Sequence, residues 1–267
     1  MEATLTGMNR TGAALSPSGT KAMTDAADEL SPAVPIDTAA MEQERLAYIN
    51  EAQAVGSIPP PASPKGVAKA GMAKPKGSAP SLFMDKLGER IAFERSGTRL
   101  YEALITKYQA TLQGGSDALV PVDQLKAEDG ESGIASVPGE TPLETLYRIR
   151  GDELGHFQML GQCMQQLGGD PTAMTPCADV QATASMGLVQ VLTDPRTTLA
   201  QCLDAMLTAE LTDNVGWEML VQLAEDAGEA DLSGRFLGAL AQEQEHLAII
   251  KGWATALLAQ GAGTPAV

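Results

Sequence analysis

The sequence predicts an all-α fold, and three observations favour it. Four long segments carry apolar residues at alternating spacings of three and four, which is the period of one face of an α-helix. Aromatic residues make up only 4% of the 267 residues, a low value for a β-sandwich or barrel. No run of alternating polar and apolar residues competes with this helical pattern. The chain therefore contains four candidate long helices.

The first two predicted helices have clear boundaries. The first spans about 81–113 and ends at a pair of glycines. The second spans about 142–167; it has a proline in its first turn and two glycines after its end, which are standard boundary signals. The connection between them, 114–141, is rich in Gly, Asp and Glu. We expect this connection to be an irregular loop.

The other two helices are predicted at about 197–227 and 230–259. Very few residues join them, so they should pack as an antiparallel pair. The connection 168–196 is long enough to run the length of a bundle, and a short helix at about 178–193 fits within it. These connections predict a four-helix bundle with a long crossover between the second and third helices.

The chain divides near residue 80. Residues 1–80 hold nine of the 16 prolines but only one aromatic residue, Tyr48. A segment of this kind buries too little apolar surface to offset its ordering entropy, so we expect it to be mostly disordered, with one short helix near 38–54. It is either a solubilising tail or a segment that docks a partner. The bundle should occupy 81–260, followed by a flexible tail at 261–267.

Charge and composition exclude several classes of function. The formal net charge of -16 argues against nucleic acid and anionic membranes as partners. There is no run of 18 apolar residues and no secretory signal, so we expect a cytoplasmic protein. The three cysteines, Cys163, Cys177 and Cys202, form no CxxC pair. A zinc ribbon, a rubredoxin-type iron site and a disulfide scaffold are therefore poor interpretations.

Carboxylates interrupt the apolar stripes. Each predicted helix carries a glutamate near its middle, on the face that should be buried. An ionised buried carboxylate costs several kcal/mol unless it is paired, protonated or bound to metal, and four of them in one core would repel each other. A pair of divalent metal ions is the direct solution. The four residues are Glu94, Glu153, Glu210 and Glu243.

The chain's only two histidines sharpen this prediction. His156 lies three residues after Glu153, and His246 lies three after Glu243. Residues at i and i+3 project from the same face of a helix, so each Glu–His pair can hold one ion. Carboxylate oxygen and imidazole together suit iron or manganese, and also bind zinc. The predicted metal ligands are Glu94, Glu153, His156, Glu210, Glu243 and His246.

This layout resembles the ferritin-like di-metal carboxylate superfamily, which includes ferritins, bacterioferritins and rubrerythrins, over about residues 81–260. The matching segments are AFERSGTRLYEAL, RGDELGHF, LTAELTDNVGWEML and AQEQEHLAII. The resemblance implies a non-haem centre of two iron ions, or alternatively two manganese ions, that reacts with dioxygen or peroxide. It also places Tyr101, seven residues after Glu94, close to the metals, where a redox role is the candidate catalytic function.

The resemblance has departures. Glu94 and Glu153 are 59 residues apart, whereas Glu210 and Glu243 are 33 apart, and the loop 114–141 accounts for the excess as an insertion. This loop and the long N-terminal segment argue against a 24-subunit storage cage. The lack of a four-cysteine module excludes a two-domain rubrerythrin of the usual kind. We still expect a homo-oligomer, a dimer or larger.

Three functions with a metal pair remain open at this point, beside a bundle without metal in which protons or Arg95, Arg99 and Arg150 satisfy the core glutamates. The leading one is a ferroxidase-type protein that binds Fe(II) and oxidises it with dioxygen or peroxide. The second is a di-manganese or di-iron enzyme that consumes peroxide, as a catalase or peroxidase does. In the third, the metal pair only stabilises the bundle, and the N-terminal segment makes the functional contacts with a partner.

Asp213 lies three residues after Glu210 on the same stripe. It is a seventh ligand, an acceptor for the second ring N–H of a histidine, or a solvated flank, and we favour the acceptor role. Asp152 could play the same part, but its position just off the stripe favours a surface role. Trp217, seven residues after Glu210, mirrors Tyr101 and is expected to fill the core.

Overall fold

The computed structural model describes residues 16–34, 36–64, 66–68, 80–125 and 137–262. Within these ranges the secondary structure is helical and contains no strand, which confirms the all-α prediction. The chain forms two compact units, described separately below.

The first unit contains α1 (Pro17–Leu30) and α2 (Ala39–Glu51). Helix α2 coincides with the short helix expected near 38–54, whereas α1 was not predicted. No residue of either helix is buried, so neither contributes to a core. Of the segment predicted to be mostly disordered, 1–80, residues 1–15, 35, 65 and 69–79 lie outside the described residues, as do residues 263–267 of the flexible tail predicted at 261–267.

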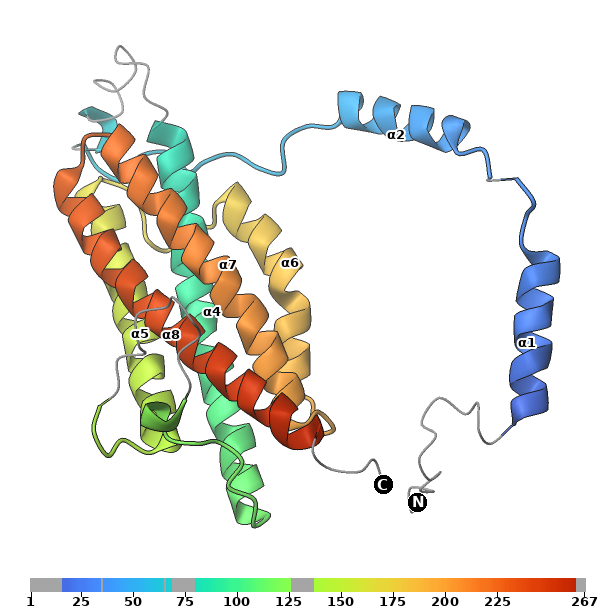
Figure 1. Cartoon of the computed structure of the whole chain (residues 1–267). Helices are drawn as coiled ribbons and strands as arrows, with labels where there is room; N and C mark the ends of the chain where they lie inside the picture. The colour runs from blue at the N-terminus through green and yellow to red at the C-terminus, as the bar shows by residue number, and fades with distance from the viewer. Residues whose placement is uncertain (1–15, 35, 65, 69–79, 126–136, 263–267) are drawn as a thin grey trace. The chain divides into compact units, whose positions relative to one another are not determined.

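The second unit contains the long helices (Figure 1). Their bounds lie within three residues of the sequence-based ones. A short 3-10 turn, η2, lies in the connection between α4 and α5, part of which is outside the described residues. The elements are α4 (Pro80–Gln113), η2 (Val122–Gln124), α5 (Pro142–Gln166), α6 (Pro176–Thr193), α7 (Leu199–Asp226) and α8 (Ala230–Ala262).

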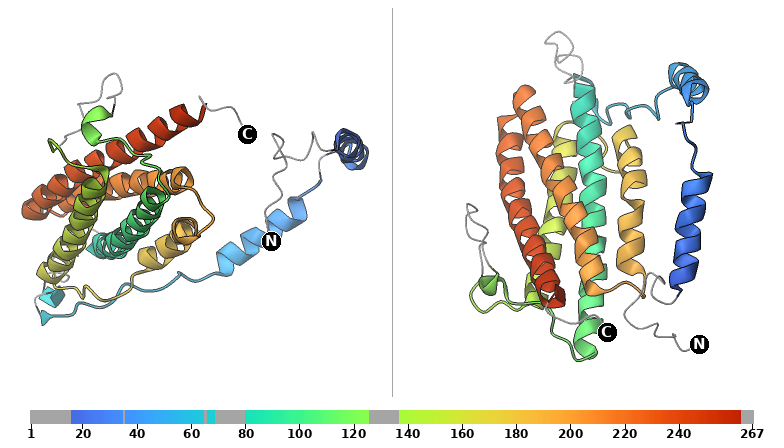
Figure 2. Two further views of the ribbon diagram at one scale, coloured as in Figure 1. Left: turned by 90° about the horizontal axis from the view of Figure 1, so that it is seen from below. Right: turned by 45° about the vertical axis from the view of Figure 1, so that its right-hand side comes forward.

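Helix α4 packs against α5, α6 and α7. Helix α8 lies alongside α5 and α7, and α6 lies on the opposite side of this unit (Figure 2). The chain runs in opposite directions along α4 and α5, and again along α7 and α8 (Figure 1). Helix α6 runs in the same direction as α4 and connects the end of α5 to the start of α7. Glu94, Glu153, Glu210 and Glu243 thus lie on four neighbouring helices.

Local sequence fixes the ends of these helices. Thr141 and Glu144 form a capping box at the start of α5, and Thr198 and Gln201 form one at the start of α7. After α7, Gly228 has φ +72°, a backbone conformation that favours glycine, and the N–H of Glu229 donates to the carbonyl of Ala224. This cap stops α7 and lets α8 begin two residues later.

The buried apolar residues of the second unit form two clusters. One is built around Tyr101, Leu203 and Trp253, and the other around Leu87 and Phe236. On each of α4, α5, α7 and α8, the glutamate identified from the sequence lies between residues of the two clusters. The core is therefore apolar, polar and apolar along its length.

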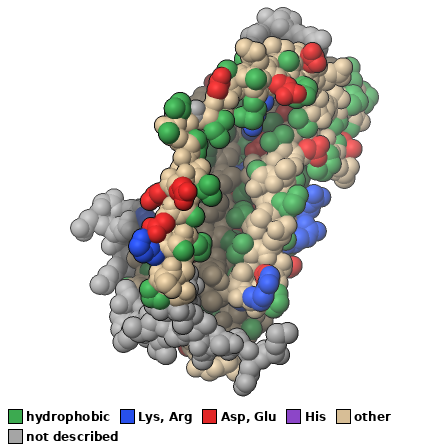
Figure 3. All heavy atoms as spheres, turned by 90° about the vertical axis from the view of Figure 1, so that its right-hand side faces the viewer, with side chains coloured by type: hydrophobic (Ala, Val, Ile, Leu, Met, Phe, Trp, Pro, Cys, Tyr) green, Lys and Arg blue, Asp and Glu red, His purple; other side chains and the backbone are tan. Residues whose placement is uncertain are grey.

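The surface is mixed in character. On the face drawn in Figure 3, hydrophobic side chains are interspersed with acidic and basic ones. Among the described residues, no helix combines the length and the apolar character needed to cross a bilayer.

Candidate metal centre

The middle of the core is a layer of ionisable side chains, which we call the carboxylate layer. Helices α4, α5, α7 and α8 all contribute to it, because each places a polar residue where its buried stripe passes between the two apolar clusters. Its members are 0–4% exposed to solvent. They are the six predicted ligands and one further acid: Glu94, Glu153, His156, Glu210, Asp213, Glu243 and His246.

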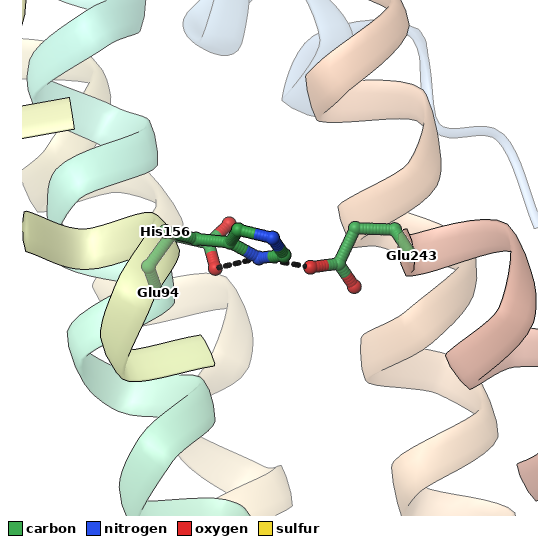
Figure 4. A group of neighbouring side chains, drawn as sticks. All are labelled: Glu94, His156 and Glu243. Atoms are coloured by element: carbon green, nitrogen blue, oxygen red, sulfur yellow. Dashed lines mark ion pairs between the residues drawn. The ribbon is translucent and has the colours of Figure 1, made fainter. Parts of the chain in front are cut away.

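Glu94, His156 and Glu243 form one set of potential ligands. The Nδ1 atom of His156 lies 2.6 Å from Oε1 of Glu243 and 3.6 Å from Oε2 of Glu94. Figure 4 shows the imidazole between the two carboxylates. One ligand atom from each residue lies within 4.8 Å of the others, so a single ion can contact all three.

Glu153, Glu243 and His246 form a second set of the same size. The Nδ1 atom of His246 lies 3.1 Å from Oε2 of Glu243 and 3.7 Å from Oε1 of Glu153. Glu243 therefore faces one histidine with each of its two oxygens, and the centroids of the two imidazole rings are 6.2 Å apart. The two sets are adjacent and share one carboxylate.

The outer nitrogens of both histidines are held by one short network. Nε2 of His156 lies 3.0 Å from Oε1 of Gln242, whose Nε2 donates to Oδ1 of Asp152. The other oxygen of Asp152 lies 3.4 Å from Nε2 of His246. Because Gln242 and Asp152 offer acceptors here, each imidazole carries a proton on Nε2. Both Nδ1 atoms then face the carboxylate layer as possible metal ligands.

Glu210 is held by a phenol. The hydroxyl of Tyr101 donates to Oε1 of Glu210, whereas Oε2 of Glu210 has no hydrogen-bond partner among the described residues. Among the described residues, no set of three ligand atoms that lie within 4.8 Å of one another includes Glu210. Tyr101 also meets the ring of His246 edge-on, with centroids 6.4 Å apart. The structure thus brings Tyr101 into the centre and leaves Glu210 beside the two ligand sets.

Asp213 pairs with an arginine that was not singled out from the sequence. Nη1 of Arg90 lies 2.6 Å from Oδ1 of Asp213, and Nε of Arg90 lies 3.6 Å from Oε1 of Glu94. The role expected for Asp213, accepting a histidine N–H, falls to Asp152 and Gln242 instead. The sequence does hold a signal for Arg90, since it precedes Glu94 by one helical turn.

Burial and mutual repulsion raise the proton affinity of several carboxylates. Burial raises the pKa of Glu153 well above its ordinary value, and the charge of Glu243 raises it further. The same two causes raise the pKa of Glu210 to about 8. Burial also raises the pKa of Asp213, although Arg90 opposes this shift. Burial acts in the same direction on Glu243, but the two histidines outweigh it and lower its pKa.

The histidines hold protons for the complementary reason. Burial lowers the pKa of His156, but hydrogen bonds to Glu243 and Glu94 outweigh burial and raise it to about 10. For His246, the charge of Glu243 and the contact with Asp152 overcome burial and raise the pKa well above its ordinary value. Glu243 with two imidazolium neighbours is a compact arrangement of opposite charges, and a metal ion would take the place of each Nδ1 proton.

Unpaired oxygen atoms show what the centre can bind. Among the described residues, Oε2 of Glu153 and Oε2 of Glu210 are buried and accept no hydrogen bond, and the two oxygens of Glu94 lie 3.6 Å from Arg90 and from His156. Buried acceptors without partners are rare in folded proteins and call for an explanation such as an ion. Carboxylate oxygen with imidazole nitrogen is a donor set for first-row divalent metals. The residues present therefore fit a pair of such ions.

No protein-family model, curated protein or solved structure matches this chain.

Proposed function

We propose that this chain is a ferritin-like protein with a non-haem di-metal centre. In this proposal α4, α5, α7 and α8 form the four-helix bundle, and α6 lies in the long crossover between the second and third of them. The antiparallel pairing of α4 with α5 and of α7 with α8 supports this topology. So does the distribution of the polar residues, one glutamate on each of two helices and Glu-x-x-His on each of the other two.

The observation that carries the proposal is the position of Glu243 between two histidines. Its two oxygens face Nδ1 of His156 and Nδ1 of His246, at 2.6 and 3.1 Å. Glu94, His156 and Glu243 would hold one ion, and Glu153, His246 and Glu243 the other, with Glu243 shared. Glu210, whose side chain Tyr101 holds, would become a further ligand if it moved toward the two sets.

We further propose that the bound metal is iron, with manganese as the alternative, and that the protein oxidises Fe(II) with dioxygen or peroxide. Bound iron would supply the electrons. The carboxylates of the protein neutralise the ions. The two apolar clusters that flank the layer exclude water from it. Asp152 and Gln242 keep the Nε2 protons of the histidines in place, so that Nδ1 stays directed inward.

A surface hollow offers a route for a small oxidant. A cavity of about 410 Å³ lies between α5 and α8, and it is lined by Gly155, Gly238, Asp152, His156 and Gln242 among others. A side chain at Gly155 or Gly238 would meet nothing within 4 Å, so the glycines leave this hollow open. Its lining includes His156, whose Nδ1 atom faces the carboxylates of the proposed centre.

The proposal is tested by metal content and by aerobic oxidation of Fe(II). We expect two metal ions per chain in protein purified without chelator. In Glu243→Gln, oxidation should fall by more than about 100-fold, because a shared ligand should matter more than the outer partners of metal-bound histidines. Glu218→Gln, at an exposed position on α7, is the matched control and should stay within about twofold of the wild type.

Each outcome of this experiment has a clear meaning. Equal oxidation rates in the wild type, Glu243→Gln and Glu218→Gln would overturn the proposed activity. Two tightly bound ions without turnover of Fe(II) or peroxide would also overturn it, and would leave a purely structural metal centre. Absence of bound metal after incubation with Fe(II) or Mn(II) would refute the centre itself.

A further inference from the structure

Arg90 is a buried cation that the proposed function does not use. It lies on α4, and only 2% of its surface is exposed. Its Nη1 atom lies 2.6 Å from Oδ1 of Asp213 and donates to the main-chain carbonyl of Asp213 at 2.9 Å. Its guanidinium stacks over the ring of Phe93, 4.1 Å from the centroid. Arg90 is therefore fixed on several sides beside the carboxylate layer.

The surrounding chain makes room for this side chain. Gly216 on α7 faces it, and a Cβ atom at Gly216 would come within 2.7 Å of Cζ of Arg90. Such a contact is far closer than carbon atoms allow, so a larger residue at 216 would displace the guanidinium. A glycine in the middle of a long helix costs stability relative to alanine, which indicates that the space for Arg90 has a use.

Arg90 lies beside a group of carboxylates that could hold another cation. Oxygens of Glu94, Glu153, Asp213 and Glu243 lie within 4.8 Å of one another, close enough to share an ion. The guanidinium contacts Asp213 at 2.6 Å and approaches Glu94 at 3.6 Å. It is a cation that the chain itself supplies to this group of acids.

The charges of the layer balance when Arg90 is included. The five acids (Glu94, Glu153, Glu210, Glu243 and Asp213) bring a formal charge of -5 when ionised, and Arg90 changes the sum to -4. Two divalent ions carry the opposite charge, with both histidines neutral as ligands. Without Arg90 one negative charge would remain in a buried site, where an unpaired charge is costly.

The pair of Arg90 and Asp213 has no counterpart at the equivalent positions on α7 and α4. Glu94 and Glu210 occupy equivalent places on α4 and α7 in the proposed topology. The residue four before Glu210 is Met206, which is apolar, whereas Arg90 takes this place before Glu94. The residue three after Glu94 is Gly97, where Asp213 follows Glu210.

We propose that Arg90, fixed by Asp213, is a built-in cation of the metal centre that occupies the place of a third metal ion and limits the centre to two divalent ions. This inference rests on the proposed metal centre. Arg90 is a positioning residue here, since it acts on Glu94 and Asp213 and does not itself hold a metal ion.

The test counts Mn(II) ions bound to the full chain under anaerobic conditions, by equilibrium dialysis and elemental analysis. We expect two ions per chain in the wild type. Arg90→Gln should bind three, because the acids lose their internal cation and Asp213 becomes free to act as a ligand. The double variant, Arg90→Gln with Asp213→Asn, should bind two again, since the cation and its partner acid are both neutralised.

Asp213→Asn alone should change the affinity for Mn(II) and leave the number of bound ions unchanged. Arg90 then lacks its partner and repels incoming cations, so binding of Mn(II) should weaken about tenfold or more at an unchanged count of two. A merely structural pair predicts something else, namely weaker binding in both single variants. That result, or two ions with wild-type affinity in Arg90→Gln, would overturn the inference.

Two precautions keep the test decisive. If Arg90→Gln does not fold without metal, it is refolded in excess Mn(II), separated from free ions by gel filtration and then analysed for metal. Arg90→Lys retains the charge and should bind two ions. A wild type that binds no Mn(II) or Fe(II) refutes the proposed centre, whereas two ions in both the wild type and folded Arg90→Gln refute only the role of Arg90.

Discussion

Asp152 shows how a residue outside the centre can govern it. One of its oxygens faces Nε2 of His246 and the other accepts from Gln242, which in turn faces His156. It is half-buried on α5, and Arg148 lies 3.8 Å away. A single side chain therefore sets the orientation of both imidazoles, which lie on different helices.

We expect Asp152→Ala to weaken binding of Mn(II) by about 10- to 100-fold, the usual effect of removing the outer partner of a metal-bound histidine. Without Asp152, His246 loses its acceptor and Gln242 loses the contact that orients it toward His156. Anaerobic titration with Mn(II) measures the change.

Two variants bracket the loss at Asp152. Asp152→Asn keeps an acceptor oxygen at nearly the same place, so its loss should be smaller than that of Asp152→Ala. Asp204→Ala removes an exposed acid on α7 and should leave the affinity unchanged. If Asp152→Ala and Asp204→Ala bind Mn(II) equally well, the network does not orient the histidines.

At the level of residues, the helical period of the apolar stripes predicts which side chains face inward. It does not predict which hydrogen bonds and ion pairs these side chains form with one another. Glu94 and His156 could be named because they interrupt an apolar face at helical spacing. Arg90 and Gln242 were not named, and Asp152 was assigned to the surface, because their partners lie on other helices. Arg90 is separated from Asp213 by 123 positions, and that proximity exists only after the helices pack.

Gly97 connects the helix scale to the site. It is buried on α4, and a Cβ atom built there would overlap the carboxylate of Glu153, with Cδ only 2.9 Å away. The absence of a side chain at 97 is what allows Glu153 on α5 to extend into the layer. The close approach of α4 and α5 at this point therefore depends on glycine at position 97, because the methyl group of an alanine would not fit.

We expect Gly97→Ala to displace Glu153 and to weaken metal binding by at least about tenfold, since one ligand of the second set moves away. Overpacking of this kind also lowers the free energy of unfolding, by about 1–3 kcal/mol. Titration with Mn(II) and thermal unfolding followed by circular dichroism measure the two effects.

Gly234→Ala is the matched control for Gly97→Ala. Gly234 is exposed on α8, and an added Cβ there would meet nothing within 4 Å. Because alanine favours helix over glycine by up to about 1 kcal/mol, this variant should be slightly more stable and should bind metal normally. Wild-type binding in Gly97→Ala would show that Glu153 is not needed where the structure places it.

The helices themselves were largely predictable, since strong boundary signals lie in the sequence. Thr141, Pro142 and the glycines after α5 mark one helix, and Gly228 marks the end of α7. Helix α1 was missed because the composition of residues 1–80 indicated disorder, and none of its residues is buried in the structure. Ser16, which accepts from the N–H of Gly19, was the available signal.

At the scale of the whole molecule, the carboxylate layer links folding to proton and metal binding. Two apolar clusters lie on either side of it, so the helices cannot pack without burying its charges. In metal-free protein, protons on the acids and the histidines must reduce the repulsion. Metal ions would replace these protons, and the stability of the fold should then depend on pH in opposite ways with and without metal.

The free energy of unfolding of the metal-free protein should fall between pH 6.5 and pH 8.5. Both Glu210, with a pKa of about 8, and His156, with a pKa of about 10, bind protons more tightly in the folded chain than in the unfolded chain. The stability that Glu210 contributes is complete below about pH 4.5 and is lost as the pH rises through about 8. The stability that His156 contributes is complete below about pH 6.5 and is lost as the pH rises through about 10. Each proton contributes a slope of up to about 1.4 kcal/mol per pH unit.

Thermal unfolding in EDTA, followed by circular dichroism at pH 6.5 and pH 8.5, measures this slope. Glu210→Gln removes one titrating group and should flatten it, whereas the exposed Glu218→Gln should not. In excess Mn(II) the fall should disappear or reverse, because the ligands bind metal in their deprotonated forms and metal affinity rises with pH. A metal-free protein that becomes more stable from pH 6.5 to 8.5 would contradict the buried, proton-holding layer, since its folded state would then be releasing protons that this geometry requires it to keep.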